Sequence, residues 1–283
     1  MVIERFAPSP TGLLHLGHAF SAWCGWTAAQ EAGGRFLLRI EDLDTGRVRQ
    51  EYEDAIFRDL TWLGLDWPED VLRQSTRRAA YETALADFAA RKLTYRCTCT
   101  RRDIREAMSA PQENTGPDGP VYPGTCRGKP VPADQPHAIR LDMDAAIAAL
   151  GGVEQVNAIT YQEIGDGAPE TGQIALNADW LRKNVGDFVL GRRDGALAYH
   201  LAVVIDDAFQ NITHITRGAD LVPATPIHRL LQALLDLPTP VYRHHRLIRD
   251  SAGKRLAKRD DARSIAAYRD QGLSPAEVLA LTA

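Results

Sequence analysis

The chain has 283 residues, of which 45% are hydrophobic and 25% charged, and its formal net charge at pH 7 is −4. This composition is ordinary for a soluble globular protein, and it excludes a membrane span, a disulfide scaffold built on the four cysteines and an overall basic field. Because the first residues do not form a basic-then-apolar leader, we expect a cytoplasmic protein with one large domain carrying an insertion, or two small ones.

The first forty residues follow a strand, turn, helix and strand pattern. Residues 2–6 are a short strand candidate, residues 7–18 contain prolines and glycines that break the chain, and a helix is predicted from 19–23. A second strand is predicted at 35–40. Strand–helix–strand is the parallel crossover unit of nucleotide-binding α/β folds, in which ligands bind at the carboxyl end of the first strand.

The turn contains two histidines directly before the predicted helix. His15 and His18 flank Leu16 and Gly17. A helix N-terminus offers free N–H groups and positive potential to a phosphate, and we expect both imidazoles to donate hydrogen bonds to phosphate oxygens. A lone histidine is more often a surface or capping residue, but this pair follows a Pro-Ser-Pro-Thr-Gly turn, which favours a nucleotide site with a base or sugar against Gly17.

The amino-acid sequence of this segment is similar to that of a known protein family. Residues 5–18 resemble the first signature of class I aminoacyl-tRNA synthetases and are most similar to the glutamyl/glutaminyl branch. The resemblance implies a Rossmann-like catalytic domain, ATP and an amino acid as substrates, and an aminoacyl-adenylate intermediate. It places Arg5, Phe6, Ala7, Pro8 and Ser9 against the substrate glutamate, and His15, Gly17 and His18 against ATP.

Acidic residues follow the second predicted strand. A solvated loop is one interpretation of Glu41, Asp42 and Asp44, and a binding site for a cationic group such as a substrate α-ammonium is the other. The segment resembles the family's Arg-Ile-Glu-Asp-Thr-Asp, in which the glutamate corresponding to Glu41 contacts the amino acid. Amphipathic helices are predicted at 47–63 and 77–91.

The pattern changes after the second of these helices. Residues 109–136 are rich in proline, glycine and small polar residues, and residues 137–165 indicate short strands around a small helix. We predict an inserted α+β subdomain over 93–186, which splits a catalytic domain made of 1–92 and 187–240. The family's insertion grips the tRNA. The remaining 241–283 are predicted to be a short C-terminal helical segment.

Three cysteines of the predicted insertion have metal-ligand spacing. Cys97 and Cys99 can bind one zinc ion, and Cys126 from a distant loop supplies a third thiolate. His137 is the conventional choice for the fourth ligand. Tyr122 fits the Cys-x-Cys…Tyr-x-x-x-Cys pattern of the short paralogues of glutamyl-tRNA synthetase, so we favour Tyr122. One structural zinc would tie down the insertion; three reduced cysteines without metal are the alternative.

Strands and an apolar run of the predicted catalytic domain are expected again from residue 187. Strands are predicted at 187–190 and 214–218, and the apolar run at 198–207 is a buried helix or strand. Tyr199 and Arg217 match the family's glutamate-site tyrosine and arginine in context. A dicarboxylic substrate needs two cationic anchors, for which Arg5 and Arg217 are the candidates because guanidinium forks match carboxylates. Which arginine takes which carboxylate stays open.

Eight lysines and arginines between 243 and 263 form a candidate basic face for tRNA. Within it, residues 255–259 resemble the second class I signature, Lys-Met-Ser-Lys-Ser, with Lys258 retained and Ala257 in place of the serine. We expect Lys258 to stabilise the leaving pyrophosphate, with Mg²⁺ bridging the phosphates.

The number of residues after Lys258 bears on which molecule we expect to receive the activated amino acid. Only 25 residues follow Lys258, where a glutamyl-tRNA synthetase continues into an anticodon-binding domain. The resemblance is therefore closest to the truncated glutamyl-queuosine tRNA(Asp) synthetase family, which activates L-glutamate without tRNA and attaches it to queuosine in the anticodon stem-loop of tRNA(Asp). A monomer is expected. The alternatives are a glutamyl-tRNA synthetase that charges a tRNA 3′ end and a non-catalytic tRNA- or nucleotide-binding homologue.

Overall fold

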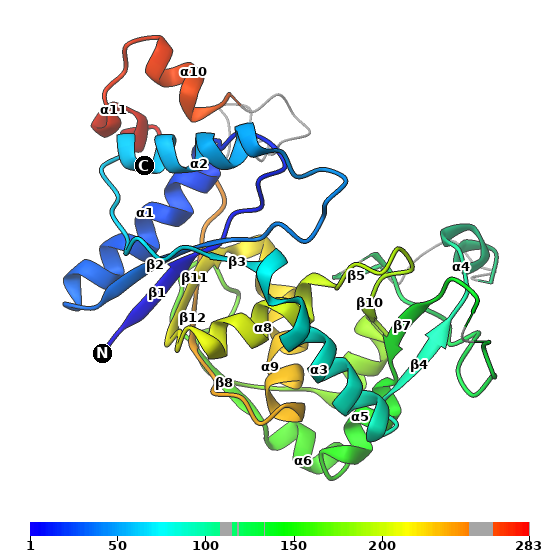
Figure 1. The fold of residues 1–283 in the computed structure, drawn as a ribbon. Coiled ribbons are helices and arrows are strands. Elements are labelled where there is room, and N and C mark those ends of the chain that lie inside the picture. The colour runs from blue at the N-terminus through cyan, green and yellow to red at the C-terminus, as the bar shows by residue number, and fades with distance from the viewer. Residues whose placement is uncertain (108–114, 118, 133, 249–262, 283) are drawn as a thin grey trace.

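The computed structural model describes residues 1–107, 115–117, 119–132, 134–248 and 263–282 (Figure 1). Its first part confirms the predicted crossover. Strand β1 (Ile3–Phe6) is parallel to β2 (Arg35–Ile40), and helix α1 (Leu16–Glu31) connects them. The short strand β3 (Leu72–Arg73) extends this sheet beyond β2. The predicted helices are α2 (Gln50–Trp62) and α3 (Arg78–Ala90).

Helix α1 packs closely on the strands because the face it buries is made of small residues. Ala19, Ala22, Gly25, Ala28 and Ala29 recur every three or four positions and are buried. A side chain at Gly25 would come to about 3.5 Å from Phe36 of β2, so the helix leaves little spare room above the sheet.

A second parallel group of strands lies beside β1. Strand β11 (His214–Gly218) is parallel to β12 (Val241–His245), which pairs with β8 (Thr160–Glu163) and through it with the antiparallel β9 (Gly172–Ala175). Thr213 donates its backbone N–H to the carbonyl of Ile3 at 3.0 Å. The Glu4 carboxylate accepts from the backbone and hydroxyl of Thr216, so a side chain joins the two strands where a backbone ladder would otherwise run.

Helices α8 and α9 cover this second group. The run left open between helix and strand is helix α8 (Tyr199–Phe209), and α9 (Thr225–Leu234) follows a 3₁₀ turn at Ala219–Ala224. Buried apolar side chains of both helices, among them Leu201 of α8 and Leu230 of α9, belong to the larger hydrophobic core, together with Ile215 of β11 and Tyr242 of β12.

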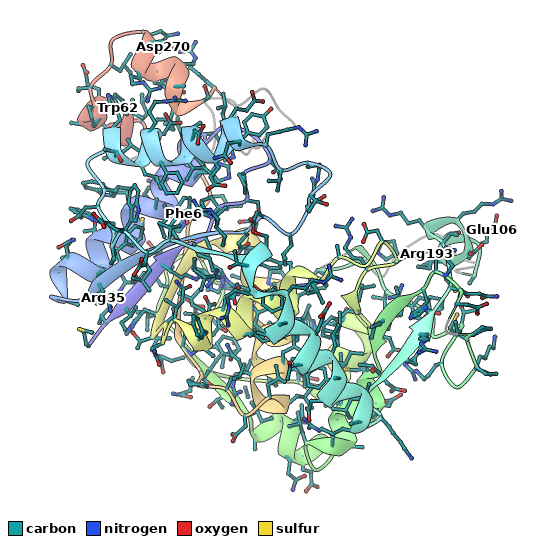
Figure 2. The ribbon with its side chains drawn as sticks, viewed as in Figure 1. Phe6, Arg35, Trp62, Glu106, Arg193 and Asp270 are labelled. Atoms are coloured by element: carbon teal, nitrogen blue, oxygen red, sulfur yellow. The ribbon has the colours of Figure 1, made fainter. Side chains whose placement is uncertain are left out.

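The third sheet is antiparallel and lies apart from the parallel strands (Figure 1). It consists of β4 (Thr94–Cys97), β7 (Ala138–Leu141) and β10 (Val189–Gly191), with β7 in the middle. The other elements of this region are α4 (Arg101–Ala107), β5 (Thr115–Gly116), β6 (Gly119–Pro120), α5 (Met143–Ala149), α6 (Val153–Ala158) and α7 (Ala178–Trp180). Figure 2 shows Glu106 and Arg193 at this end of the molecule, away from Asp270.

The predicted domain boundaries stay a prediction, but the strand pairing adds detail to them. Residues 160–175, placed in the predicted insertion, are hydrogen-bonded into the sheet of β11 and β12 through β8. The strand predicted at 187–190 is β10, and it pairs with β7 of the antiparallel sheet. β12 itself lies in the range predicted as the C-terminal segment.

The end of the chain is helical, as predicted. Helices α10 (Ile265–Asp270) and α11 (Pro275–Ala280) lie beside α1 and α2 (Figure 1). Ile265 donates to the carbonyl of Leu14 at 2.9 Å, so this segment is attached to the turn that precedes α1. Among the described helices, none combines the length and apolar character that crossing a bilayer requires.

Candidate active site

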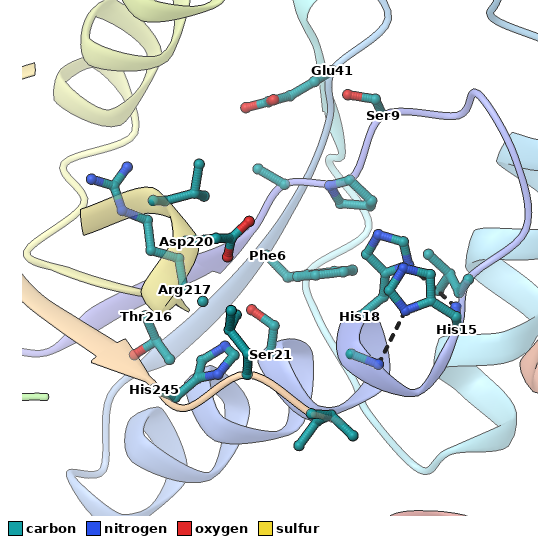
Figure 3. A pocket seen from close by; sticks show the side chains of 18 of the residues that line it. Phe6, Ser9, His15, His18, Ser21, Glu41, Thr216, Arg217, Asp220 and His245 are labelled. Carbon is teal, nitrogen blue, oxygen red and sulfur yellow. Dashed lines mark hydrogen bonds between the residues drawn. The ribbon is translucent and has the colours of Figure 1, made fainter. Parts of the chain in front are cut away.

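A cavity of about 490 Å³ opens at the carboxyl ends of β1 and β11, where the two parallel groups of strands meet (Figure 3). This is the position at which open α/β sheets bind ligands. Eleven residues singled out in the sequence line it together: Arg5, Phe6, Ala7, Pro8, Ser9, His15, Gly17, His18, Glu41, Tyr199 and Arg217. Their roles stay predictions, and Lys258 and Ala257 lie outside the described residues.

The two histidines close the N-terminus of α1. Nδ1 of His15 accepts from the N–H of Gly17 at 3.1 Å, and Nδ1 of His18 accepts from the N–H of His15 at 3.2 Å. This reciprocal arrangement is a capping box in which histidines replace the usual Ser or Thr and Glu. It also explains why the helix begins at Leu16, three residues before the predicted start.

Capping fixes the chemistry that the two rings present to a ligand. Because each Nδ1 accepts a hydrogen bond, each neutral ring carries its proton on Nε2 and is a donor there. The rings stack with their centroids 3.7 Å apart (Figure 3). A Cβ at Gly17 would come within 3.1 Å of the His15 ring, so glycine keeps this pair in place. Capping and phosphate binding are therefore compatible roles for the same side chains.

A buried ion network lies at the floor of the cavity. Arg5 donates from Nε to Asp207 at 3.0 Å, and Arg39 donates from Nη1 to the same carboxylate at 2.6 Å. Arg39 also donates to Glu41 at 3.2 Å. All four side chains are at most 8% exposed. Burial alone would raise the pKa of Asp207, but the two guanidinium groups hold it below its usual range. Burial raises the pKa of Glu41, against the charge of Arg39.

We expect Asp207→Asn to destabilise the protein by about 3–5 kcal/mol at pH 7, because it leaves two buried guanidinium groups without their shared anion. Since the native pKa of Asp207 is lowered, its contribution is complete above about pH 4 and is lost as the pH falls further. Urea unfolding at pH 5 and pH 7 should therefore give the same difference from the parent protein.

Asp44→Asn is the control for this comparison. Asp44 pairs with the exposed Arg47, so its loss should cost less than about 1 kcal/mol. Equal losses for the two variants would contradict the role given to Asp207.

Arg217 differs from Arg5 in its partners. It is 4% exposed, yet its three hydrogen bonds to other described side chains go to the neutral groups of Thr225, His228 and His244. Among the described residues no carboxylate lies within ion-pair distance of its guanidinium. Buried charges are normally paired, so this cation at the wall of the cavity is suited to an anionic ligand. Figure 3 shows Arg217 across the cavity from Glu41.

The cavity continues toward β12. Its lining there includes Thr216, Gly218, Asp220 and His245. His245 donates from Nδ1 to the carbonyl of Arg246 at 2.8 Å, which leaves Nε2 as an acceptor. Burial lowers the pKa of His245, so the ring is neutral near pH 7.

A second cavity, of about 790 Å³, extends from the same residues toward the antiparallel sheet. Ser9, Glu41 and Tyr199 line both cavities. Its lining also includes Arg47, Arg101 and Arg192, together with Asp44, which pairs with Arg47 and Arg192. This cavity therefore connects the predicted glutamate site with Arg101 of α4 and Arg192, which follows β10.

The three cysteines predicted as metal ligands meet in the antiparallel sheet region. Their Sγ atoms lie within 4.8 Å of one another, and Cys99 and Cys126 are 3.5 Å apart. Four ligands around a tetrahedral zinc, each about 2.3 Å from it, would be separated by roughly 3.8 Å, so the cluster could hold a metal ion. Burial alone would raise the pKa of Cys126, but hydrogen bonds, chiefly with Tyr122, lower it to about 6.

The two candidates for the fourth ligand are separated by their position. The Tyr122 hydroxyl lies 3.3 Å from Cys97 Sγ and 3.5 Å from Cys99 Sγ. His137 donates from Nδ1 to the carbonyl of Gln135 at 2.7 Å and does not belong to the cysteine group. The geometry therefore favours Tyr122.

Several residues that shape the site had no sequence-based prediction. Asp207 and Arg39 neutralise the cavity floor, and Thr225, His228 and His244 hold Arg217. The adjacent acids at the end of the apolar run 198–207 were a usable signal, because a carboxylate in a buried element needs a partner. His228 and His244 each stand next to an arginine in the sequence and carry no comparable motif.

The chain resembles known proteins over nearly its whole length. Residues 1–282 match a family model described as the catalytic domain of class I tRNA synthetases (E and Q). A protein of Rhodobacter capsulatus named glutamyl-Q tRNA(Asp) synthetase is 51% identical over 283 residues, covering 98% of each chain. A protein of Deinococcus radiodurans with the same name is 43% identical over 99% of this chain and 87% of its own.

The fold is also similar to that of a solved structure. The crystal structure of a glutamate tRNA ligase from Elizabethkingia meningosepticum, in complex with its amino acid, matches with a TM-score of 0.73 and 28% identity. The match covers 97% of this chain and 58% of that ligase, so the chain spans less than two thirds of the ligase's length.

Proposed function

Because the chain belongs to the class I tRNA synthetases of the glutamate and glutamine branch, and is therefore a ligase-type enzyme, we propose that it activates L-glutamate with ATP, without tRNA, and transfers the glutamate to queuosine in the anticodon of tRNA(Asp). The observation that carries the choice of amino acid is Arg217, a buried cation at the cavity wall with neutral partners. A side-chain carboxylate of the substrate would supply the missing anion.

The two ends of the glutamate have different requirements. The α-carboxylate loses its own charge when it becomes part of the adenylate, so a permanent cation is better matched to the side-chain carboxylate, which stays ionised. We therefore assign Arg217 to the side chain and Glu41 to the α-ammonium group. Tyr199 and Ser9, which also line the cavity, are suited to hydrogen-bond the remaining polar atoms.

Activation is an in-line displacement. An oxygen of the α-carboxylate bonds to the α-phosphorus of ATP, and the bond from that phosphorus to the bridging oxygen breaks, releasing pyrophosphate. The chain contributes positioning and electrostatic stabilisation. The Nε2 donors of His15 and His18, at the positive end of α1, would bind the phosphate oxygens. Mg²⁺ bound with ATP would neutralise part of the phosphate charge, and Lys258 would stabilise the leaving group.

Two observations support the proposed acceptor. The relatives at 51% and 43% identity both bear the name glutamyl-Q tRNA(Asp) synthetase. The second cavity adjoins the predicted glutamate site and is lined by Arg101 and Arg192, so it would admit a nucleobase while these arginines contact RNA phosphates. A monomer in the cytoplasm stays a prediction.

We further propose that one structural zinc ion binds Cys97, Cys99, Tyr122 and Cys126. It would close a region whose described loops bury few apolar side chains. The purified protein should contain about one zinc per chain by mass spectrometry of the metal. Cys99→Ser should lose the zinc and unfold at a lower temperature, whereas Cys24→Ser, which alters a thiol on α1, should keep it. Equal zinc content and melting temperature in both variants would exclude this site.

The activation step is tested by ATP–pyrophosphate exchange without tRNA. We expect exchange with L-glutamate and exchange at least about 100-fold weaker with L-glutamine, because the amide leaves Arg217 without an anion. Exchange that requires tRNA would contradict the proposal and favour charging of a tRNA 3′ end.

A further inference from the structure

The side chains behind Arg217 form a closed group of buried hydrogen-bond acceptors. Arg217 donates from Nε to Nε2 of His244 at 3.0 Å, from Nη1 to Nδ1 of His228 at 3.1 Å and from Nη2 to the hydroxyl of Thr225 at 2.7 Å. The three acceptors are at most 1% exposed. They come from β12 and from two positions of α9, so the guanidinium is held by elements that pack around β11.

These bonds fix the proton positions of the histidines, because an arginine only donates. His244 must carry its proton on Nδ1, which lies 2.5 Å from Oε2 of Glu163. His228 must carry its proton on Nε2, which lies 2.9 Å from Nδ1 of His200. Glu163 in turn accepts from the backbone N–H groups of Gly165 and His244. The far side of each ring therefore has an acceptor for the single proton that the neutral ring carries.

The group keeps its acceptors neutral. Burial lowers the pKa of His228 well below its usual value, and the neighbouring charge of Arg217 acts in the same direction. Burial also lowers the pKa of His244, against the opposing effect of Glu163. The contrast with Arg5 is direct, since Arg5 is bound by the carboxylate of Asp207. Two arginines thus line one cavity, and only one of them has its charge compensated by the protein among the described residues.

Two N–H groups of Arg217 remain after its three hydrogen bonds to the acceptors. A guanidinium has five N–H groups, and the three bonds leave one on Nη1 and one on Nη2. A carboxylate can accept from both. An amide offers a single oxygen and presents its own N–H₂ group to the other donor, so it fits this pair poorly.

We propose that His228 and His244, together with Thr225, are positioning residues that leave the charge of Arg217 uncompensated and direct its remaining N–H groups into the cavity, so that the site selects a carboxylate side chain over the corresponding amide. This inference rests on the proposed activation of glutamate and extends it from the arginine that binds the ligand to the acceptors that keep the arginine available.

The test compares His228→Gln with His228→Glu, two side chains of the same shape that differ in charge. Glutamine keeps a neutral acceptor for Nη1, and glutamate places an anion there. In exchange assays without tRNA we expect His228→Gln to raise the KM for L-glutamate by less than about 5-fold, and His228→Glu to raise it by about 10- to 100-fold. The preference for L-glutamate over L-glutamine should fall about 10-fold or more in His228→Glu alone, and the KM for ATP should change little in either variant.

A purely structural role for His228 would not produce this charge dependence. Thermal unfolding of both variants checks that each is folded, and Thr225→Asn against Thr225→Asp repeats the comparison at Nη2 if His228→Glu does not fold. Equal KM values for glutamate within the folded pair would overturn the inference while leaving the proposed function intact. A parent protein without glutamate-dependent exchange would overturn both.

Discussion

Replacing Arg217 with alanine is expected to abolish nearly all use of glutamate. The substitution removes a buried cation of the cavity wall whose hydrogen-bond partners are neutral, and which has no carboxylate within ion-pair distance among the described residues. Truncating one partner of a buried, hydrogen-bonded charge pair costs about 2–5 kcal/mol, which corresponds to a loss of roughly 30-fold to several thousand-fold in kcat/KM for glutamate. ATP–pyrophosphate exchange over a range of glutamate concentrations measures this loss.

Two further variants separate the causes. Arg217→Lys keeps a positive charge but lacks the planar fork, so it should recover a small part of the activity. Arg35→Ala removes an exposed arginine at the start of β2 and should leave exchange unchanged. An Arg217→Ala variant whose kcat/KM for glutamate stays within about 3-fold of the parent value would contradict this role of Arg217.

The second large effect is expected at His18. Its Nδ1 accepts from the N–H of His15, so the neutral ring carries its proton on Nε2, which is the atom proposed to donate to phosphate. Asparagine places an oxygen near the position of Nδ1 and has no atom at that of Nε2. His18→Asn should therefore keep the helix cap but lower kcat by about 10²- to 10³-fold, the usual cost of removing one donor to a developing charge.

His18→Gln gives the reciprocal comparison. Its amide N–H₂ lies near the position of Nε2, so this variant should keep more activity, while its melting temperature should fall because the acceptor at the cap is displaced. Rates and melting temperatures of the two variants should thus change in opposite order. If both lose activity only in proportion to their stability, His18 is a capping residue and the phosphate role is wrong.

The core of the fold could be predicted from the sequence because its signals are local. The strand at 2–6, the turn at 7–18 and the strand at 35–40 have the spacing and the glycine and proline breaks of a crossover, and the structure confirms it. The start of α1 was predicted three residues late because the cap is made by His15 and His18, which propensity does not mark as cap residues.

Pairings between distant parts of the chain could not be predicted in this way. The run 198–207 is apolar enough for either a buried strand or a buried helix, and it forms α8. Strand β10 follows the predicted insertion in the chain, yet it pairs with β7. This pairing could not be predicted, because hydrogen bonding to a distant strand leaves no local sequence pattern.

The residues of the candidate site also differ in whether the sequence predicts them. Arg5, Glu41 and Arg217 stand in segments that resemble family motifs, and they do line one cavity. The difference between the two arginines depends on Asp207, which is 202 positions from Arg5 in the chain, and on the histidines behind Arg217. Only the folded arrangement shows which arginine keeps its charge available to a ligand.

The most direct test of the account is the transfer of labelled glutamate to an isolated anticodon stem-loop of tRNA(Asp), prepared with queuosine and with guanosine at the same position. With ATP and the purified protein, the account predicts label on the stem-loop that carries queuosine and background on the one that carries guanosine. Label that appears only on full-length tRNA, and that is released with its terminal adenosine, would contradict the account.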